Sequence, residues 1–132
     1  MDEPQLSQQV LKLGAARVFV YDLAAAHAFY SGKLGLRLKT SNARFGYLVY
    51  DAGRTELVVG AVAPDAKEDD HAMVGRVTGL SFYVDNIAAM HRALLAREVF
   101  FSAPPKRQPW GGIMATFADP AGNQLNLLQL RG

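Results

Sequence analysis

Two similar stretches of the chain decide the fold: FVYDLAAAHAFYSGKL at residues 19–34 and FYVDNIAAMHRALLAR at residues 82–97. Each stretch begins with apolar strand-forming residues, passes through an aspartate, and continues as about three turns of amphipathic helix. Asp22 and Asp85 are placed to accept hydrogen bonds from the free N–H groups of the helix that follows. The pattern therefore predicts two copies of one strand–helix unit.

Each predicted helix has one apolar face, as expected for a helix that packs on a sheet. Gly35 follows the first helix, where a glycine is a typical helix stop. The residues that share the apolar face are Leu23, Ala26, Tyr30 and Leu34 in the first helix and Ile87, Met90 and Leu94 in the second.

Three strand-like segments follow each helix, at residues 37–40, 45–51 and 55–61 and again at 99–102, 113–118 and 124–130. Turns are predicted at residues 51–53 and 119–122, where Asp, Gly and Pro gather. The chain is therefore a duplication of a βαβββ unit. We predict an α+β protein with an N-terminal arm at residues 1–13 and a single domain at 14–132. Within it, module 1 covers about 15–62, a charged linker 63–77 and module 2 about 78–130.

Composition sets the broad class of the protein. Half of the 132 residues are hydrophobic, which is enough for one core, and the absence of Cys excludes disulfide bonds and thiolate zinc sites. The polar start differs from a signal peptide, and no apolar run reaches the roughly 20 residues that cross a membrane. A net charge of +2 is too small and too dispersed to indicate nucleic-acid binding. We expect a soluble, cytoplasmic protein that binds neither membranes nor nucleic acids.

Three motifs resemble the vicinal oxygen chelate superfamily, which groups glyoxalase I, extradiol dioxygenases and bleomycin-resistance proteins. They are VYDLAAAHAFYSGKLGL at residues 20–36, LSFYVDNIAAM at 80–90 and PWGGIMATFADPAGNQLNLLQ at 109–129. The resemblance covers about residues 15–130. It implies two paired βαβββ modules whose curved mixed sheets surround a cleft, with the helices outside, and it implies a homodimer, in some members with exchanged units.

The resemblance also implies four cleft-facing metal positions, at Ala15, Glu56, Gly79 and Asn126. Of these only Glu56 is a competent ligand, because Ala15 and Gly79 have no donor atom and an amide oxygen is a poor substitute for a carboxylate. A catalytic zinc needs about three protein ligands, and other transition metals also need several. We expect no cofactor, with a divalent metal as the alternative. The histidines fall in the predicted helices and linker, outside the cleft: His27, His71 and His91.

Strand alternation extends the set of cleft-facing side chains. Glu56 could pair with Arg17, and Asn126 could serve a ligand or merely bond a neighbour such as Glu56. Trp110 lies in a proline-rich loop and is expected either to pack on the core or to stack over a flat ligand at the cleft mouth. The predicted ligand-binding residues are Arg17, Phe19, Arg54, Glu56, Ser81, Tyr83, Trp110, Gln124 and Asn126.

Aromatic walls, a few charges and two amides suit a small organic molecule with an aromatic or conjugated part. The first hypothesis is a metal-free protein, similar to the bleomycin-resistance branch, that sequesters such a molecule without transforming it. The alternative is a lyase, isomerase or dioxygenase that uses Glu56 as a general base or metal ligand. A purely structural role is the third. The sequence does not name the ligand or substrate.

Overall fold

The computed structural model describes residues 9–131, so residues 1–8 of the predicted arm and residue 132 lie outside it. The chain forms two four-stranded sheets. Sheet 1 has the strand order β1-β4-β3-β2, with strands β1 (Ala15–Val20), β2 (Arg37–Asn42), β3 (Tyr47–Asp51) and β4 (Glu56–Ala61). Sheet 2 has the order β5-β8-β7-β6, with strands β5 (Val77–Tyr83), β6 (Phe100–Arg107), β7 (Ile113–Ala118) and β8 (Gln124–Gln129).

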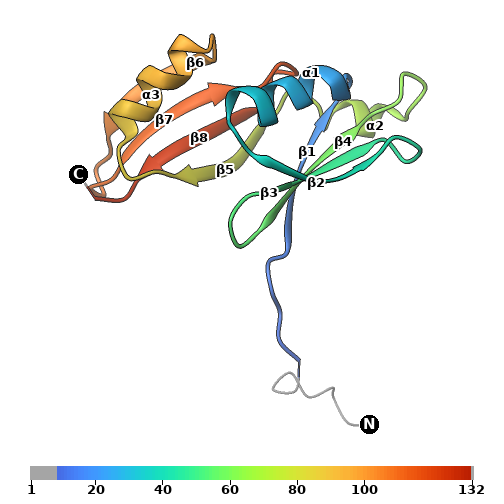
Figure 1. The fold of residues 1–132 in the computed structure, drawn as a ribbon, viewed down its shortest axis with the longest axis horizontal. Coiled ribbons are helices and arrows are strands. Elements are labelled where there is room, and N and C mark those ends of the chain that lie inside the picture. The colour runs from blue at the N-terminus through green and yellow to red at the C-terminus, as the bar shows by residue number, and fades with distance from the viewer. Residues whose placement is uncertain (1–8, 132) are drawn as a thin grey trace.

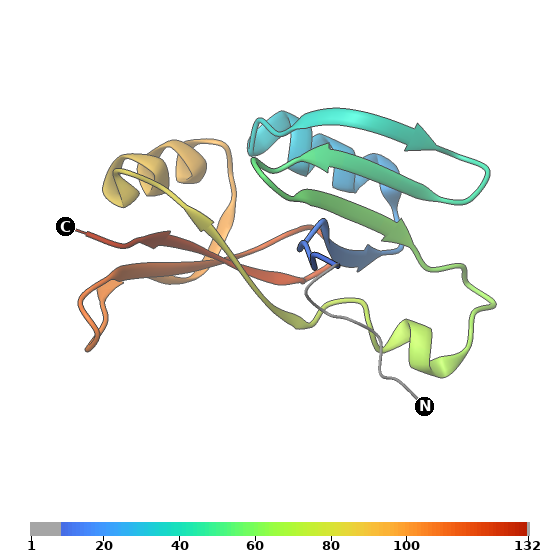
Figure 2. The same cartoon turned by 90° about the horizontal axis from the view of Figure 1, so that it is seen from below.

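Both sheets are mixed in the same way: the first strand of each module runs parallel to its last strand, and the other pairs are antiparallel. This confirms the predicted pair of βαβββ modules. Figures 1 and 2 show the two sheets side by side, each with its own helix layer. The helices are α1 (Leu23–His27), which continues directly into the π-helix η2 (Ala28–Lys33), α2 (Glu68–His71) in the linker, and α3 (Ile87–Ala96).

In Figure 1, α1 and α3 lie on the same side of their sheets. Side chains therefore alternate along each strand between a buried face under these helices and a face that they leave uncovered. We call the second face the open face. On sheet 1 it carries Ala15, Arg17, Phe19, Tyr47, Val49, Asp51, Glu56, Val58 and Gly60; on sheet 2 it carries Val77, Ser81, Tyr83, Met114, Thr116, Ala118, Gln124, Asn126 and Leu128.

The two helix starts are capped differently. Asp22 caps α1 as predicted, since its Oδ1 accepts a hydrogen bond from the backbone N–H of Ala25 at 3.1 Å. The prediction that Asp85 caps the second helix is wrong, because Asn86 is the cap and accepts from the N–H of Ala89 at 3.0 Å. The cap residue must directly precede the first helical residue, and α3 begins one position later relative to its strand than the repeat suggests.

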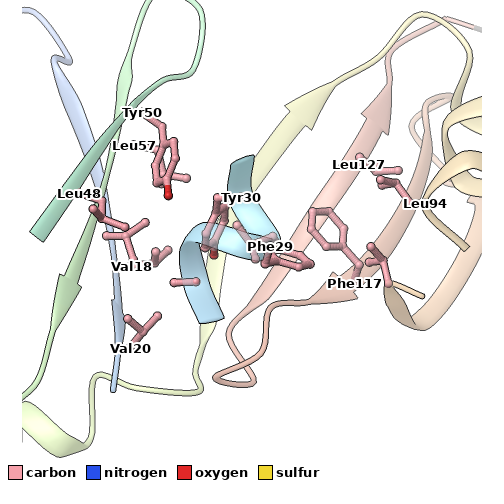
Figure 3. Packing of buried hydrophobic residues seen from close by; sticks show 14 of the residues in the cluster. Val18, Val20, Phe29, Tyr30, Leu48, Tyr50, Leu57, Leu94, Phe117 and Leu127 are labelled. Carbon is pink, nitrogen blue, oxygen red and sulfur yellow. The ribbon is translucent and has the colours of Figure 1, made fainter. Parts of the chain in front are cut away.

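The π-helix η2 carries two consecutive aromatic residues that point into the core. Phe29 points toward Phe117 of sheet 2 and Tyr30 toward Tyr50 of sheet 1, as Figure 3 shows. Phe29 was missing from the predicted apolar face, although it follows the buried Ala26 by three residues, which is the spacing of one helix face. In this way η2 joins the buried side chains of both modules into one core.

The second helix also differs from its predicted face. Ile87 and Leu94 are buried as expected, but Met90 is 39 % exposed. His91 is the half-buried neighbour instead, and its ring packs edge-on against Phe101 with the ring centroids 4.6 Å apart. The helix is thus rotated slightly about its axis relative to the expected packing.

A group of hydrogen bonds around Tyr30, Asp119 and Asn123, which we call the seam, connects module 2 to module 1. The Asp119–Gly122 turn is formed as predicted, with the N–H of Gly122 bonded to the Asp119 carbonyl at 3.0 Å. Asp119 accepts the hydroxyl proton of Tyr30 at 2.7 Å. The buried amide of Asn123 spans three segments: its nitrogen donates to the carbonyl of Phe19 in β1 and to the Asp119 carboxylate, and its oxygen accepts from the linker N–H groups of Gly75 and Arg76.

The predicted proline-rich loop after residue 102 is largely strand. β6 runs to Arg107 and includes Pro104 and Pro105. Proline is tolerated there because β6 is an edge strand and its pairing with β7 shifts register twice over this stretch. None of the helices in residues 9–131 is long and apolar enough to span a bilayer.

Candidate functional site

The open face of sheet 1 is built from three rows of side chains that cross the strands. Neighbouring strands bring these residues side by side, so each row has a distinct chemistry. The first row is charged at three of its four positions, the second has two valines between an arginine and a threonine, and the third is mainly apolar. The rows are Ala15–Glu56–Asp51–Arg37, then Arg17–Val58–Val49–Thr40, then Phe19–Gly60–Tyr47–Asn42.

Both carboxylates of the first row are neutralised. Asp51 pairs with Arg37 at 3.0 Å, and the hydrogen bond from Arg37, with one from the Gly53 backbone, lowers the pKa of Asp51. Glu56 forms an ion pair with Lys39. Glu56 is thus bound to neither Arg17 nor Asn126, the two partners considered from the sequence, and Asn126 bonds another neighbour, Thr116. A β-bulge between Leu38 and Thr40 shifts the register and lets Lys39 reach across the open face. The local sequence contains no signal that predicts this bulge.

The apolar side chains of the second and third rows form a flat surface next to the guanidinium of Arg17. Val58 and Val49 are half-buried, and the Phe19 ring lies over Gly60, where an added Cβ would be 3.6 Å from the ring. Arg17 is exposed and has no hydrogen-bond or ion-pair partner among residues 9–131. Its guanidinium is available to a ligand.

The open face of sheet 2 is polar at its centre and apolar toward its ends. Asn126 lies between Ser81 and Thr116, and its Oδ1 accepts a hydrogen bond from the Thr116 hydroxyl at 2.9 Å. Large apolar side chains remain uncovered at the ends of the face: Val77 is 71 % exposed, Tyr83 71 % and Phe100, which pairs with Ala118, 68 %.

The predicted site residues are brought together in part. Glu56 and Ser81 line one cavity of about 230 Å³, together with mostly apolar residues from both modules. Glu56 and Asn126 belong to different sheets, and each has its own partner. Gln124 lies beside Val77 on the open face of sheet 2.

Two predicted residues lie in turns. Arg54 is exposed between β3 and β4. Trp110 is 59 % exposed between β6 and β7, with its ring packed over Gly112 and outside the core cluster. Trp110 is therefore no core lid, and its exposed ring surface is open to a ligand.

The donor atoms present do not fit the divalent metal site that the fold implies. Ala15 stands directly beside Glu56 and offers only a methyl group, and Gly79 lies in an irregular part of β5 with φ +74°. The Glu56 carboxylate is bound to Lys39 and the Asn126 oxygen to Thr116. Among the described residues, no three or more His, Cys, Asp or Glu side chains are placed so that they could hold a metal ion together.

The histidines serve packing instead. His27 is hydrogen-bonded to the Tyr50 hydroxyl and His71 to the Tyr21 hydroxyl, each at 2.8 Å, and His91 packs on Phe101. Their positions in α1, α2 and α3 agree with the predicted helices and linker.

The model of the Glyoxalase/Bleomycin resistance protein/Dioxygenase superfamily matches residues 12–127. The chain belongs to this superfamily. The resemblance read from the strand–Asp–helix and DPAGN motifs is thereby confirmed. No curated protein sequence is similar enough to the chain to count as a match.

Solved members of the superfamily share the fold over nearly their whole length. A superfamily member from Sphaerobacter thermophilus is 28% identical with a TM-score of 0.78, covering 91% of this chain and 98% of that one. TnmS3, an antibiotic binding protein from Streptomyces sp. CB03234, is 28% identical with a TM-score of 0.74, covering 92% and 97%. A lactoylglutathione lyase from Agrobacterium tumefaciens is 21% identical with a TM-score of 0.72, covering 89% and 92%, which shows the common fold alone.

Proposed function

We propose that the chain is a metal-free binding protein that sequesters an aromatic or conjugated small molecule on its open sheet faces. The observation that carries this proposal is the state of the four implied metal positions. Ala15 and Gly79 lack donors, while Glu56 and Asn126 already have protein partners. A surface whose ion-binding groups are missing or engaged, but whose apolar and polar neighbours are kept, suits an organic ligand.

The side chains around these positions support the same proposal. Phe19, Val58 and Val49 offer flat apolar contact on sheet 1, and Ser81 and Asn126 offer neutral hydrogen-bonding groups on sheet 2. Such a combination of apolar walls and a few polar groups is usual for small-molecule sites. The similarity to TnmS3, an antibiotic binding protein, supports the binding of a small molecule.

We further propose that the protein is a homodimer in which two copies enclose the ligand. Val77, Tyr83 and Phe100 are each more than two-thirds exposed on one face of sheet 2. Uncovered large apolar side chains favour contact with another surface, because burial removes them from water. An open face of sheet 1 from a second copy is complementary, because Phe19, Val49 and Val58 give it an apolar surface of its own. We place this dimer in the cytoplasm, as the composition without Cys suggests.

A thermal-shift screen against aromatic natural products tests binding directly, since a ligand selective for the folded state raises the apparent stability. Hits should also change the fluorescence of Trp110, the single tryptophan. Light scattering gives the mass in solution and should show two copies. Stoichiometric zinc, nickel, manganese or iron in the purified protein, lost in Glu56→Gln, would contradict the proposal.

The alternative is a lyase, isomerase or oxygenase in which Glu56 acts as a general base. It has one observation in its favour: Glu56 and Ser81 line a common cavity. That cavity, about 230 Å³, is below the usual range for small-molecule sites of about 300–1,000 Å³. Glu56→Gln separates the two functions, because it should abolish turnover by an enzyme but only tune the affinity of a binding protein.

A further inference from the structure

The charges on the open faces indicate which ligands the proposed binding protein selects. On sheet 1 the two carboxylates, Glu56 and Asp51, are each paired with a cation, Lys39 and Arg37 respectively. Arg17 remains unpaired among the described residues. The open face of sheet 1 therefore carries one uncompensated positive charge and no uncompensated negative charge.

The open face of sheet 2 adds no negative charge. Its side chains on β5, β7 and β8 are apolar, hydroxyl or amide groups, and the one charged residue in register with them is Lys106, beside Met114 at the sheet edge. The side chains of these two sheet faces thus carry a net positive charge, and Asp69 and Asp70 lie beyond them on α2. Charge complementarity favours an anionic occupant.

The surroundings of Arg17 match an anion attached to a flat ring. Val58 is its cross-strand neighbour, and Phe19 lies two residues further along β1, roughly 6.6 Å away at the usual strand rise. The Phe19 ring covers Gly60, so no side chain projects between Arg17 and this aromatic surface on β4. A planar ring lying over Val58 and Gly60 would place a substituent of carboxylate size over the guanidinium, which binds such groups through two parallel hydrogen bonds.

The charges near Phe19 determine in which direction an anionic ligand lies on the open face of sheet 1. Phe19 also lines a cavity of about 490 Å³ with Asp69, Asp70 and apolar residues of β4 and the linker. Both aspartates repel an anionic group, so the reverse placement is unfavourable. Attraction by Arg17 and repulsion by Asp69 and Asp70 therefore both favour placing the anionic group at the Arg17 end of the face.

We propose that the ligand is an aromatic anion, bound with its carboxylate, sulfonate or phenolate on Arg17 and its ring over Phe19, Val58 and Gly60. This inference rests on the proposed binding function and narrows it, because a cationic ligand would meet an unpaired cation and no free carboxylate on these faces. Arg17 is in this account the residue that determines specificity.

Three probes with the same ring system test the proposal: 2-naphthoate, 2-naphthamide and 2-naphthylmethylammonium. Titration calorimetry should show that the naphthoate binds about tenfold more tightly than the amide, as expected for one charge-assisted contact, and that the ammonium binds most weakly. The naphthoate affinity should fall as NaCl is raised.

Arg17→Gln should bring the naphthoate affinity down to that of the amide and leave the amide affinity unchanged. Arg92→Gln is the matched control, because Arg92 is an exposed arginine on α3, away from the open faces. Unchanged circular dichroism and thermal midpoint show that both variants are folded.

Equal affinities for the three probes, a preference for the ammonium, or a naphthoate preference that survives Arg17→Gln would overturn the proposal, and so would the failure of all three probes to bind. The proposed binding function fails by a different result, namely the absence of any hit in the thermal-shift screen. A screen whose hits are all neutral or cationic would keep the binding function and overturn the anion proposal.

Discussion

Replacing Tyr30 by Phe removes one hydroxyl group from the seam between the modules. Tyr30 is fully buried, and its hydroxyl donates to Asp119 Oδ2 at 2.7 Å. Asp119 is itself buried and keeps its bonds from Ala121 and Asn123 in the variant. A hydrogen bond to a charged group contributes about 1.5–3 kcal/mol, and a phenylalanine ring preserves the contact with Phe29. We therefore expect Tyr30→Phe to lower the free energy of unfolding by about 2 kcal/mol.

Urea unfolding at pH 7, followed by circular dichroism, measures this change. The midpoint should fall while the dependence of the free energy on urea stays constant, because the surface exposed on unfolding is the same. Tyr47→Phe is the matched control. The Tyr47 hydroxyl is on the half-buried open face and accepts only a long bond from Asn42, at 3.4 Å, so its loss should cost less than about 0.5 kcal/mol.

The same variant has a signature at alkaline pH. Burial, and then the Asp119 carboxylate, raise the pKa of Tyr30 far above its ordinary value, and burial raises the pKa of Tyr50 to about 12. Below about pH 10 both tyrosines are protonated in the folded and unfolded chains, so they add no pH dependence. Above it the unfolded chain loses protons that the folded chain keeps, and stability falls by about 1.4 kcal/mol per pH unit for each tyrosine. Between about pH 10 and 12, the free energy of unfolding of Tyr30→Phe should therefore fall with pH about half as steeply as that of the parent protein.

A variant within about 0.5 kcal/mol of the parent at pH 7, or one with the same alkaline slope, would refute this account. The first result would mean that water replaces the hydroxyl at Asp119. The second would mean that Tyr30 ionises in the folded chain, which its burial forbids.

Other substitutions test the remaining features. Asn123→Ala removes the partners of the Phe19 carbonyl and of linker N–H groups, and urea unfolding should show a loss of about 3 kcal/mol, whereas less than about 1 kcal/mol would contradict the role of the seam. Gly112→Ala places a Cβ in the space that the Trp110 ring occupies, so the ring must move and the tryptophan emission should shift with little change in stability; an unchanged spectrum would contradict the packing. Lys39→Gln breaks a half-exposed ion pair and should cost at most about 1 kcal/mol by urea unfolding, a larger loss being the contrary result.

The features that were predicted correctly are those that a short stretch of chain determines. Strand alternation placed Arg17 and Phe19 on the face opposite the core. Asp22 caps its helix by accepting from the N–H group three residues later, and the DPAG turn is closed by a hydrogen bond between its first and last residues. These depend on strand pleating, helix ends and turn dihedrals, which residues within about four positions settle. Asp85 failed as a cap because such local signals do not locate an element boundary to one residue.

By itself, the sequence determined the duplicated βαβββ architecture, the open-face identity of most candidate residues and the lack of donor atoms at Ala15 and Gly79. Only the tertiary structure decided that Lys39, and neither Arg17 nor Asn126, neutralises Glu56, and that Phe29 joins the two modules through a π-helix. The physical reason is that ion pairs across strands depend on register and bulges, which arise from the pairing of distant segments. The charge left over on Arg17, and hence the anion that we propose for it, follows from that pairing.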